Sequence, residues 1–264
     1  MPGLIDSHCH IDAPEFDDDR EAVLARARAA GVSWIVVPAV TAAGWPKLKA
    51  LTEEDAQLAP AWGLHPLFLE QHQPAHIEQL RYWLEHERPC AIGECELDFH
   101  VPGLDPERQR EILLAQLRLA REFDLPLILH ARKSLDAVMA LLRRFPGLRG
   151  VVHSFSGSWQ QAEQLIAMGF YLGIGGPVTH ARAQRLRGIV QRLPLDHLLL
   201  ETDAPDQPDA GIPGQRNEPA RLVQVLQVIA ELRDMPPHDL AAHTSANAVR
   251  LFGLDHLRPL RVRT

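Results

Sequence analysis

The sequence "LIDSHCH" at residues 4–10 places a short apolar run directly before two histidines, His8 and His10. Successive side chains of a strand point to opposite faces, so these two imidazoles would lie on the same side. Such a pair either marks the place where a strand leaves the core or supplies two ligands to a metal ion. Because the chain contains 14 histidines, the pair alone favours the first interpretation.

Short apolar runs of this kind recur along the whole chain. The eight runs are "LID" (4–6), "SWIVVPA" (33–39), "PAWGLH" (60–65), "CAIGE" (90–94), "LPLILH" (125–130), "GVVHS" (150–154), "FYLGIG" (170–175) and "HLLLET" (197–202). Stretches with helical periodicity, roughly 10 to 15 residues long, separate them, as expected of βαβ units. In one of these stretches Asp105 and Pro106 suit the N-cap and first position of a helix.

Eight strands alternating with helices predict an α/β fold of the TIM (β/α)8 barrel type, with residues 1–264 forming one domain. A doubly wound open sheet is the main rival, and the number of strands does not exclude it. The segment 205–222 is the longest irregular stretch, and we interpret it as an active-site loop.

Composition restricts the setting in which the protein works. Hydrophobic residues make up 46% of the chain and charged residues 23%, which is typical of a globular protein with a substantial core. We expect a cytoplasmic protein without a signal peptide or membrane span, and Cys9, Cys90 and Cys95 to be reduced thiols. The net charge of -7 argues against non-specific coating of nucleic acid, so a phosphate-rich substrate would need a local source of positive charge.

The ends of the predicted strands carry residues of the types that bind ions. In a TIM barrel these ends meet at one face, where the chemistry takes place. The residues are His8, His10, His65, Glu94, His130, His153 and Asp203. Each alone could be an ordinary polar group, but their convergence by accident is far less expected than a metal site.

Six motifs in order along the chain resemble the TatD family of metal-dependent deoxyribonucleases, and within it the YjjV-like branch. They are "IDSHCH" (5–10), "GLHP" (63–66), "IGECELDF" (92–99), "LILHAR" (127–132), "VVHSFSGS" (151–158) and "LLLETDAP" (198–205). The resemblance runs from the first strand to the helix opened by "RNEPARL" at 216–222. It implies a TIM barrel of the amidohydrolase-like type, in agreement with the count of strands.

The resemblance implies two divalent metal ions per chain. His8, His10 and Asp203 would hold one ion and His130 with His153 the other. Two such ions need a bridging carboxylate, and Glu94 is the candidate. Imidazoles with carboxylates suit Zn, Mn or Co, and additional water ligands would permit Mg. Asp203 and Glu94 are therefore the predicted catalytic residues, with Asp203 orienting a water and accepting its proton.

The implied activity is hydrolysis of phosphodiester bonds, as by an exonuclease-like deoxyribonuclease, on DNA or a small phosphoester. We expect a monomer with no obligatory protein partner. A metallohydrolase of another ester or amide on the same scaffold is the alternative, and a non-catalytic metal-binding protein is a third. A subtype with a carboxylated bridging lysine is disfavoured, because Lys47, Lys49 and Lys133 are the only lysines and none ends the fourth strand.

His65 and Arg132 are the predicted substrate-binding residues. His65 would orient a phosphate, although Pro66 beside it also suits a plain strand-to-loop corner. Arg132 would pair with phosphate through its planar guanidinium, and a surface ion pair is the equal alternative.

Other polar residues are expected to play supporting parts. Glu201 and Asp98 would orient metal ligands. His72 lies in a polar stretch and is expected to be solvated.

Glu96, in "GECELDF", stands where related sequences usually have glycine. Either the backbone turns differently here, or a left-handed conformation is tolerated at a cost of roughly 1–2 kcal/mol. If strand alternation persists, Glu96 lies on the same side as Glu94 and adds a carboxylate at the mouth of the pocket; otherwise it is solvated.

Overall fold

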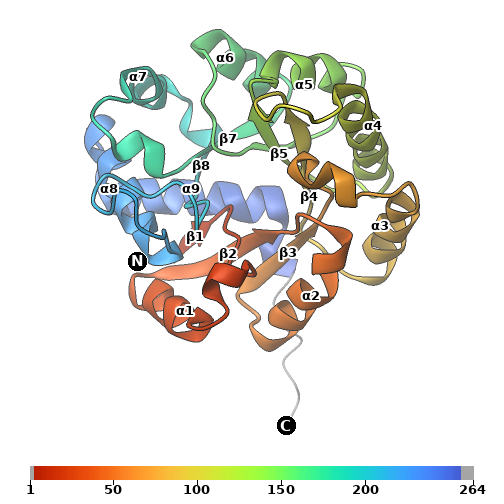
Figure 1. The fold of residues 1–264 in the computed structure, drawn as a ribbon. Coiled ribbons are helices and arrows are strands. Elements are labelled where there is room, and N and C mark those ends of the chain that lie inside the picture. The colour runs from red at the N-terminus through yellow and green to blue at the C-terminus, as the bar shows by residue number, and fades with distance from the viewer. Residues whose placement is uncertain (1–2, 257–264) are drawn as a thin grey trace.

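The computed structural model describes residues 3–256. In it, eight parallel strands are arranged in sequence order around a nearly closed barrel (Figure 1). The strands are β1 (Leu4–Asp6), β2 (Val32–Pro38), β3 (Leu58–Trp62), β4 (Ala91–Asp98), β5 (Leu127–Arg132), β6 (Gly150–Val152), β7 (Phe170–Ile174) and β8 (Leu198–Leu200). The backbone N–H of Ser7 donates to the carbonyl of Leu200 at 3.0 Å and joins the first strand to the last. The TIM barrel is confirmed and the open sheet is wrong. The predicted domain ends, residues 1 and 264, lie outside the described residues.

Helices follow the strands and surround the barrel (Figure 1). They are α1 (Arg20–Ala29), α2 (Trp45–Glu54), α3 (Ala75–His86), α4 (Pro106–Glu122), α5 (Leu135–Leu142), α6 (Trp159–Ala167), α7 (Gln184–Arg192), α8 (Leu222–Leu232) and α9 (Pro237–Phe252). Short 3₁₀ helices are η1 (Pro14–Phe16), η2 (Ala42–Gly44), η3 (Pro66–Gln71), η4 (Gly176–Thr179), η5 (Leu195–His197), η6 (Pro219–Arg221) and η7 (Leu254–His256). The helix α4 begins as predicted, because the Asp105 carboxylate accepts hydrogen bonds from the backbone N–H groups of Glu107 and Arg108.

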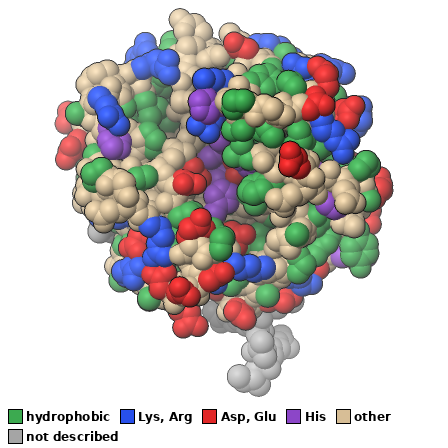
Figure 2. Space-filling view, viewed as in Figure 1, with side chains coloured by type: hydrophobic (Ala, Val, Ile, Leu, Met, Phe, Trp, Pro, Cys, Tyr) green, Lys and Arg blue, Asp and Glu red, His purple; other side chains and the backbone are tan. Residues whose placement is uncertain are grey.

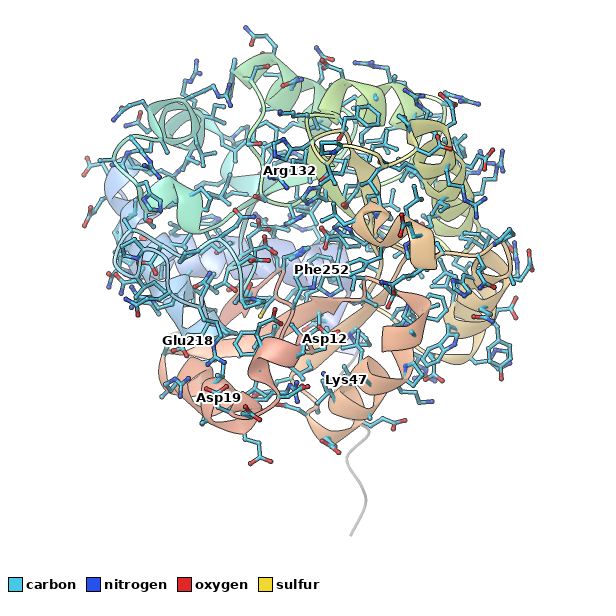
Figure 3. The ribbon with its side chains drawn as sticks, in the orientation of Figure 1. Asp12, Asp19, Lys47, Arg132, Glu218 and Phe252 are labelled. Atoms are coloured by element: carbon cyan, nitrogen blue, oxygen red, sulfur yellow. The ribbon has the colours of Figure 1, made fainter. Side chains whose placement is uncertain are left out.

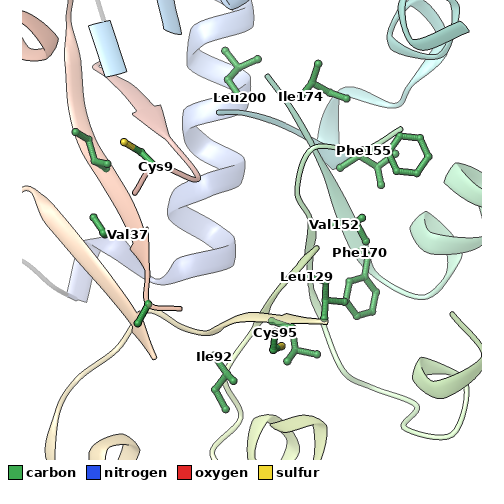
Figure 4. Packing of buried hydrophobic residues seen from close by; sticks show 14 of the residues in the cluster. Cys9, Val37, Ile92, Cys95, Leu129, Val152, Phe155, Phe170, Ile174 and Leu200 are labelled. Atoms are coloured by element: carbon green, nitrogen blue, oxygen red, sulfur yellow. The ribbon is translucent and has the colours of Figure 1, made fainter. Parts of the chain in front are cut away.

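Two layers of apolar side chains hold the barrel together. The larger layer lies between the strands and the surrounding helices, where Leu129, Val152 and Phe170 pack from neighbouring strands (Figure 4). The smaller one fills the inside of the barrel and includes Leu251 and Phe252 from α9. This helix runs behind the strands in Figure 1 and contacts β1 and β8, so it covers the end of the barrel opposite the histidines seen near the centre of Figure 2.

None of the helices in the described part of the chain combines the length and the apolar character needed to cross a bilayer. The three cysteines are free and buried, as expected of reduced thiols.

Candidate metal centre

The predicted ligands converge in a hollow at one face of the barrel, where Figure 2 shows histidine side chains near the centre. The hollow is a cavity of about 530 Å³. Its lining includes His10, Glu94, His130, His153 and Asp203. The side chain of His8 lies beneath them and is completely buried. Parallel strands all present their carboxyl ends at this face, which explains why residues so distant in sequence meet here.

One oxygen of Glu94 faces the first group of predicted ligands. Its Oε2 atom lies 3.3 Å from Nε2 of His8 and 3.3 Å from Nε2 of His10. Nε2 of His8 also lies 3.4 Å from Oδ1 of Asp203. Two ligand atoms at about 2.1 Å from a tetrahedral ion lie about 3.4 Å from each other, so these spacings fit one divalent ion.

The other oxygen of Glu94 faces the second group. Its Oε1 atom lies 2.8 Å from Nε2 of His153 and 3.4 Å from Nδ1 of His130. The two imidazole nitrogens lie 3.0 Å from each other. Glu94 therefore stands between the two groups in the position that a bridging carboxylate requires.

Unpaired polar atoms in the centre also fit a cation. Oε2 of Glu94 is buried and accepts no hydrogen bond from any described residue. A buried carboxylate oxygen without a donor is costly unless a positive charge compensates it. The donor set of imidazoles and carboxylates suits Zn, Mn or Co, and also Mg where water completes the coordination.

The charges of the carboxylates perturb the imidazoles around them. Burial alone would lower the pKa of His10, but the nearby carboxylate of Glu94, 3.3 Å away, raises it to about 9. Burial raises the pKa of Asp203 to about 6, although His153 and His10 oppose this shift. Burial would also raise the pKa of Glu94, yet the surrounding histidines, His153 foremost, bring it well below its ordinary value. The negative charge that holds protons on these imidazoles is the same charge that would hold a cation.

Three residues just after strands adopt left-handed backbone conformations beside this centre. They are Lys133 after β5, Ser154 after β6 and Asp203 after β8, with φ values of 57°, 47° and 57°. Non-glycine residues in this region cost of order 1–3 kcal/mol each and cluster at functional sites. At Asp203 the conformation is fixed by a backbone hydrogen bond to the carbonyl of His8 at 2.9 Å and by the Gln207 amide, which donates to the carboxylate.

Two further carboxylates, Glu201 and Asp98, lie behind two of the predicted metal ligands, His153 and His130. Oε1 of Glu201 lies 3.7 Å from Nδ1 of His153, and Oδ2 of Asp98 lies 3.8 Å from Nε2 of His130. Burial would raise the pKa of Asp98, but His130 and two backbone N–H groups lower it to about 2. A carboxylate on the far nitrogen of a ligating imidazole fixes its tautomer and orientation.

The two predicted substrate-binding residues occupy different depths. Arg132 is exposed at the rim of the cavity, near the middle of this face in Figure 3. It forms no ion pair with the residues from 3 to 256, and both its contact with phosphate and the alternative role stay predictions. His65 is buried, and its Nδ1 accepts a hydrogen bond from the Leu67 backbone, so only Nε2 points into the centre.

Glu96 differs from both expectations stated for its environment. Strand alternation persists and places it on the same side as Glu94, but β4 stays extended through Asp98 and Glu96 has no positive φ. Its side chain is buried, not solvated and not at the mouth. Oε2 of Glu96 accepts the backbone N–H of His130 at 2.9 Å, and Oε1 lies 2.8 Å from Nε2 of His65. Burial would lower the pKa of His65, but Glu96 and Glu94 raise it to about 10.

The expectation that His72 is solvated is wrong. His72 is buried, and its Nε2 lies 2.7 Å from the carbonyl oxygen of His65, which it helps to hold in place. The 3₁₀ helix η3 folds the chain back between these two residues, and its six-residue span has no clear helical periodicity in the sequence. Gln207 was also missed, because it comes from the irregular loop, of which only the general role was predicted.

A (β/α)8 barrel with histidines and carboxylates gathered at its strand ends is an architecture of metal-dependent hydrolases. Residues 5–253 match the family model described as "TatD related DNase". The metal-dependent hydrolase YjjV of Escherichia coli K12 is 45% identical over 257 residues, which cover 95% of this chain and 98% of that protein. The chain therefore belongs to the TatD family of metal-dependent hydrolases.

Solved structures and other relatives agree with this assignment. The crystal structure of Escherichia coli YjjV superposes with a TM-score of 0.91 at 43% identity, covering 95% of this chain and 98% of that one. A protein named as the 3′-5′ ssDNA/RNA exonuclease TatD of Erwinia tasmaniensis is 35% identical over 261 residues, 95% of this chain and 100% of that protein. A phosphotriesterase-like lactonase variant of Deinococcus radiodurans, at 16% identity and a TM-score of 0.65, shares the fold.

Proposed function

We propose that this protein is a deoxyribonuclease that uses two divalent ions to hydrolyse phosphodiester bonds at the end of a DNA strand. The observation that carries the proposal is the position of Glu94, whose two carboxylate oxygens face two separate groups of donors. When bound, two such ions polarise a phosphodiester and lower the pKa of the attacking water. His8, His10 and Asp203 would hold one ion, and His130 with His153 the other.

Asp203 is the proposed proton acceptor. It lines the cavity, and its Oδ1 lies 3.4 Å from Nε2 of His8, beside the position of the first ion. The Gln207 amide and the backbone hydrogen bond to His8 fix its direction. A fixed carboxylate can orient a water molecule and take its proton without first reorganising.

The size of the cavity suits one end of a DNA strand better than a long bound segment of it. At about 530 Å³ it is within the range of roughly 300–1,000 Å³ typical of small-ligand pockets. Arg132 at its rim would pair with the phosphate that follows the cleaved bond. The two ions would supply the positive field that a chain with a net charge of -7 otherwise lacks. The exonuclease name of the Erwinia relative is consistent with this mode of action.

The proposal includes a monomeric enzyme in the cytoplasm. A monomer suffices because all the donors of the centre come from one chain. Buried free thiols at Cys9, Cys90 and Cys95 fit a reducing compartment.

The test uses the full chain, stripped of metal with a chelator and reloaded separately with Mg, Mn, Zn or Co. Single-stranded DNA labelled at either the 5′ or the 3′ end is digested and resolved into a ladder, beside a panel of small phosphodiesters, carboxylic esters and amides. We expect stepwise release of nucleotides from one end, and Asp203→Asn is the control for a contaminating nuclease. Turnover of an ester or amide with intact DNA would instead establish the alternative metallohydrolase.

A further inference from the structure

A second cavity opens beside the cavity that contains the metal centre. It has a volume of about 540 Å³, similar to the 530 Å³ of the first cavity. Both are lined by Ala131, near the end of β5, and by Ser156, in the loop between β6 and α6. The other walls of the second cavity come from Phe99 after β4, from the first turn of α5, and from Gln161 of α6 and Arg185 of α7. A strand whose end is held in the first cavity can therefore continue into the second.

Three exposed cations line these two cavities. Arg132 lines the first cavity, and Lys133 and Arg185 line the second. None of the three forms an ion pair with a carboxylate of residues 3–256, whereas exposed arginines elsewhere, such as Arg26 and Arg28, are paired. Because their charge is not compensated by a neighbouring carboxylate, these cations favour an anionic ligand at the cavities.

The second cavity keeps a positive charge after its acidic residue is counted. Among the described residues its lining contains one carboxylate, that of Asp136, whose Oδ1 accepts a hydrogen bond from the Gln161 amide at 2.7 Å. Two cations, Lys133 and Arg185, stand against this single negative charge. The Arg185 guanidinium is held in place, since its Nη2 donates to the carbonyl of Ser156 at 2.7 Å on the wall that the two cavities share.

Phe99 gives the second cavity an aromatic side. Its backbone N–H donates to the carbonyl of Arg132 at 3.0 Å, so the ring is fixed next to the residue at the rim of the first cavity. The half-buried ring packs against the core, and the Arg110 guanidinium lies 5.6 Å from its centroid. The part of Phe99 that stays exposed lines the cavity. Proteins that bind single-stranded nucleic acid combine a positively charged groove with aromatic rings on which bases of any identity stack.

We propose that the second cavity binds the nucleotides that follow the cleaved bond in a single strand of DNA. A base stacks there on Phe99, and a phosphate pairs with Lys133 and Arg185, beyond the phosphate assigned to Arg132. The inference rests on the proposed nuclease function and extends it along the strand, from the end in the metal centre to the segment behind that end.

The first measurement compares thymidylate oligomers of two and five nucleotides, because only the longer one has a base and phosphates to place in the second cavity. The metal-loaded full chain hydrolyses both, and the length ratio is kcat/KM on five nucleotides divided by kcat/KM on two. We expect a length ratio of at least about ten in the wild type. It should fall at least about fivefold in Phe99→Leu, since this is the lower end of what one stacked base contributes.

The second measurement tests the phosphate contact of Lys133. Binding of the labelled five-nucleotide probe is followed by fluorescence anisotropy at several salt concentrations, in an Asp203→Asn background that prevents digestion. Each phosphate contact on a single strand contributes about 0.7 to the slope of log K against log salt concentration. Lys133→Gln should therefore reduce the magnitude of this slope by about 0.7.

Two matched controls remove similar groups outside both cavities. Phe123 is also a half-buried aromatic residue, with the Arg81 guanidinium 6.0 Å from its centroid, and Phe123→Leu should leave the length ratio unchanged. Arg144 is an exposed cation beyond the far end of α5, and Arg144→Gln should leave the salt slope unchanged.

The outcomes separate this inference from the proposed function. A wild-type length ratio near one, a ratio that Phe99→Leu does not change, or a slope that Lys133→Gln does not change would each overturn the subsite and leave the nuclease standing. Absence of hydrolysis of either oligomer would overturn the proposed function, and the salt slopes would then decide the subsite alone. Should Phe99→Leu not fold, the slope of Lys133→Gln decides, because that side chain is exposed.

Discussion

The absence of a side chain at Gly173 on β7 leaves room for the Glu201 carboxylate behind His153. Gly173→Ala should therefore weaken metal binding although Gly173 is not itself a predicted ligand. A Cβ atom at Gly173 would lie 2.0 Å from Oε2 and 2.8 Å from Cδ of Glu201, and 3.1 Å from Cα of His153. Contacts this short force Glu201 to move. Glu201 would then lose the hydrogen bond that its Oε1 accepts from the backbone N–H of Ser154 at 2.5 Å, and it would move away from Nδ1 of His153.

Gly173→Ala should lower both the free energy of unfolding and the affinity for metal. Forcing a methyl group into a filled space costs typically about 1–3 kcal/mol of the free energy of unfolding. Loss of the carboxylate behind a ligating histidine typically weakens metal binding about 10–100-fold. Because His153 faces Oε1 of Glu94, the weakening should fall on the second ion.

The assay combines urea unfolding of the metal-stripped protein with calorimetric titration of Zn²⁺. Gly188→Ala is the matched control, because Gly188 lies inside α7 and an added Cβ meets no atom within 4 Å. That control should leave metal binding unchanged and stabilise the helix by up to about 1 kcal/mol. If Gly173→Ala unfolds and binds both ions like the wild type, Glu201 does not position His153 and the reasoning fails.

Three further predictions concern the metals, the proposed base and a remote ion pair. Chelation should abolish hydrolysis but leave the far-UV circular dichroism of the barrel unchanged, because the apolar layers do not depend on the ions. Hydrolysis by a protein that elemental analysis shows to be free of metal would contradict this. Asp203→Asn should lower kcat on a phosphodiester by at least about a hundredfold at saturating metal with an unchanged Tm, and wild-type turnover would remove Asp203 from the mechanism. Asp209→Asn should destabilise the protein by about 1–3 kcal/mol near neutral pH, since it breaks the paired hydrogen bonds from Arg221 at 2.7 and 2.8 Å. Burial would raise the pKa of Asp209, but the hydrogen bonds from Arg221 lower it below 3.8. The stability that the Asp209–Arg221 pair contributes is therefore complete above pH 3.8 and disappears as the pH falls through the pKa of Asp209 in the folded protein. A difference in unfolding free energy between wild type and Asp209→Asn that persists in stronger acid would contradict this role of the pair.

The barrel was predictable because local and global signals coincide in this sequence. Each strand is a short apolar run, and helix starts such as Asp105 carry the residues that satisfy free backbone N–H groups. Closure of parallel strands then brings their carboxyl ends together, so His8, His130 and Asp203 could be placed at one site without knowledge of any contact.

The features that were missed depend on packing across the barrel. Within residues 3–256 no strand follows the helix α9, and only the closed barrel explains why Leu251 and Phe252 are buried. In the sequence His72 lies in a polar stretch, which predicts exposure. It is buried because η3 folds the chain back so that His72 contacts the carbonyl of His65. No pattern within a short window of sequence contains this information.

Glu96 shows where strand periodicity stops being informative. Alternation correctly gives the side of the strand but not the depth, which depends here on β4 continuing to Asp98. At that depth Glu96 faces His65, and not solvent, so its charge is compensated inside the protein. A charge at the mouth would repel DNA in a way that weakens with salt, whereas a buried pair is screened much less. Glu96→Gly should therefore change the affinity for metal and leave the salt dependence of DNA binding as in the wild type, measured by fluorescence anisotropy at several ionic strengths. A salt slope altered in Glu96→Gly, with both metal affinities retained, would place this carboxylate against the substrate after all.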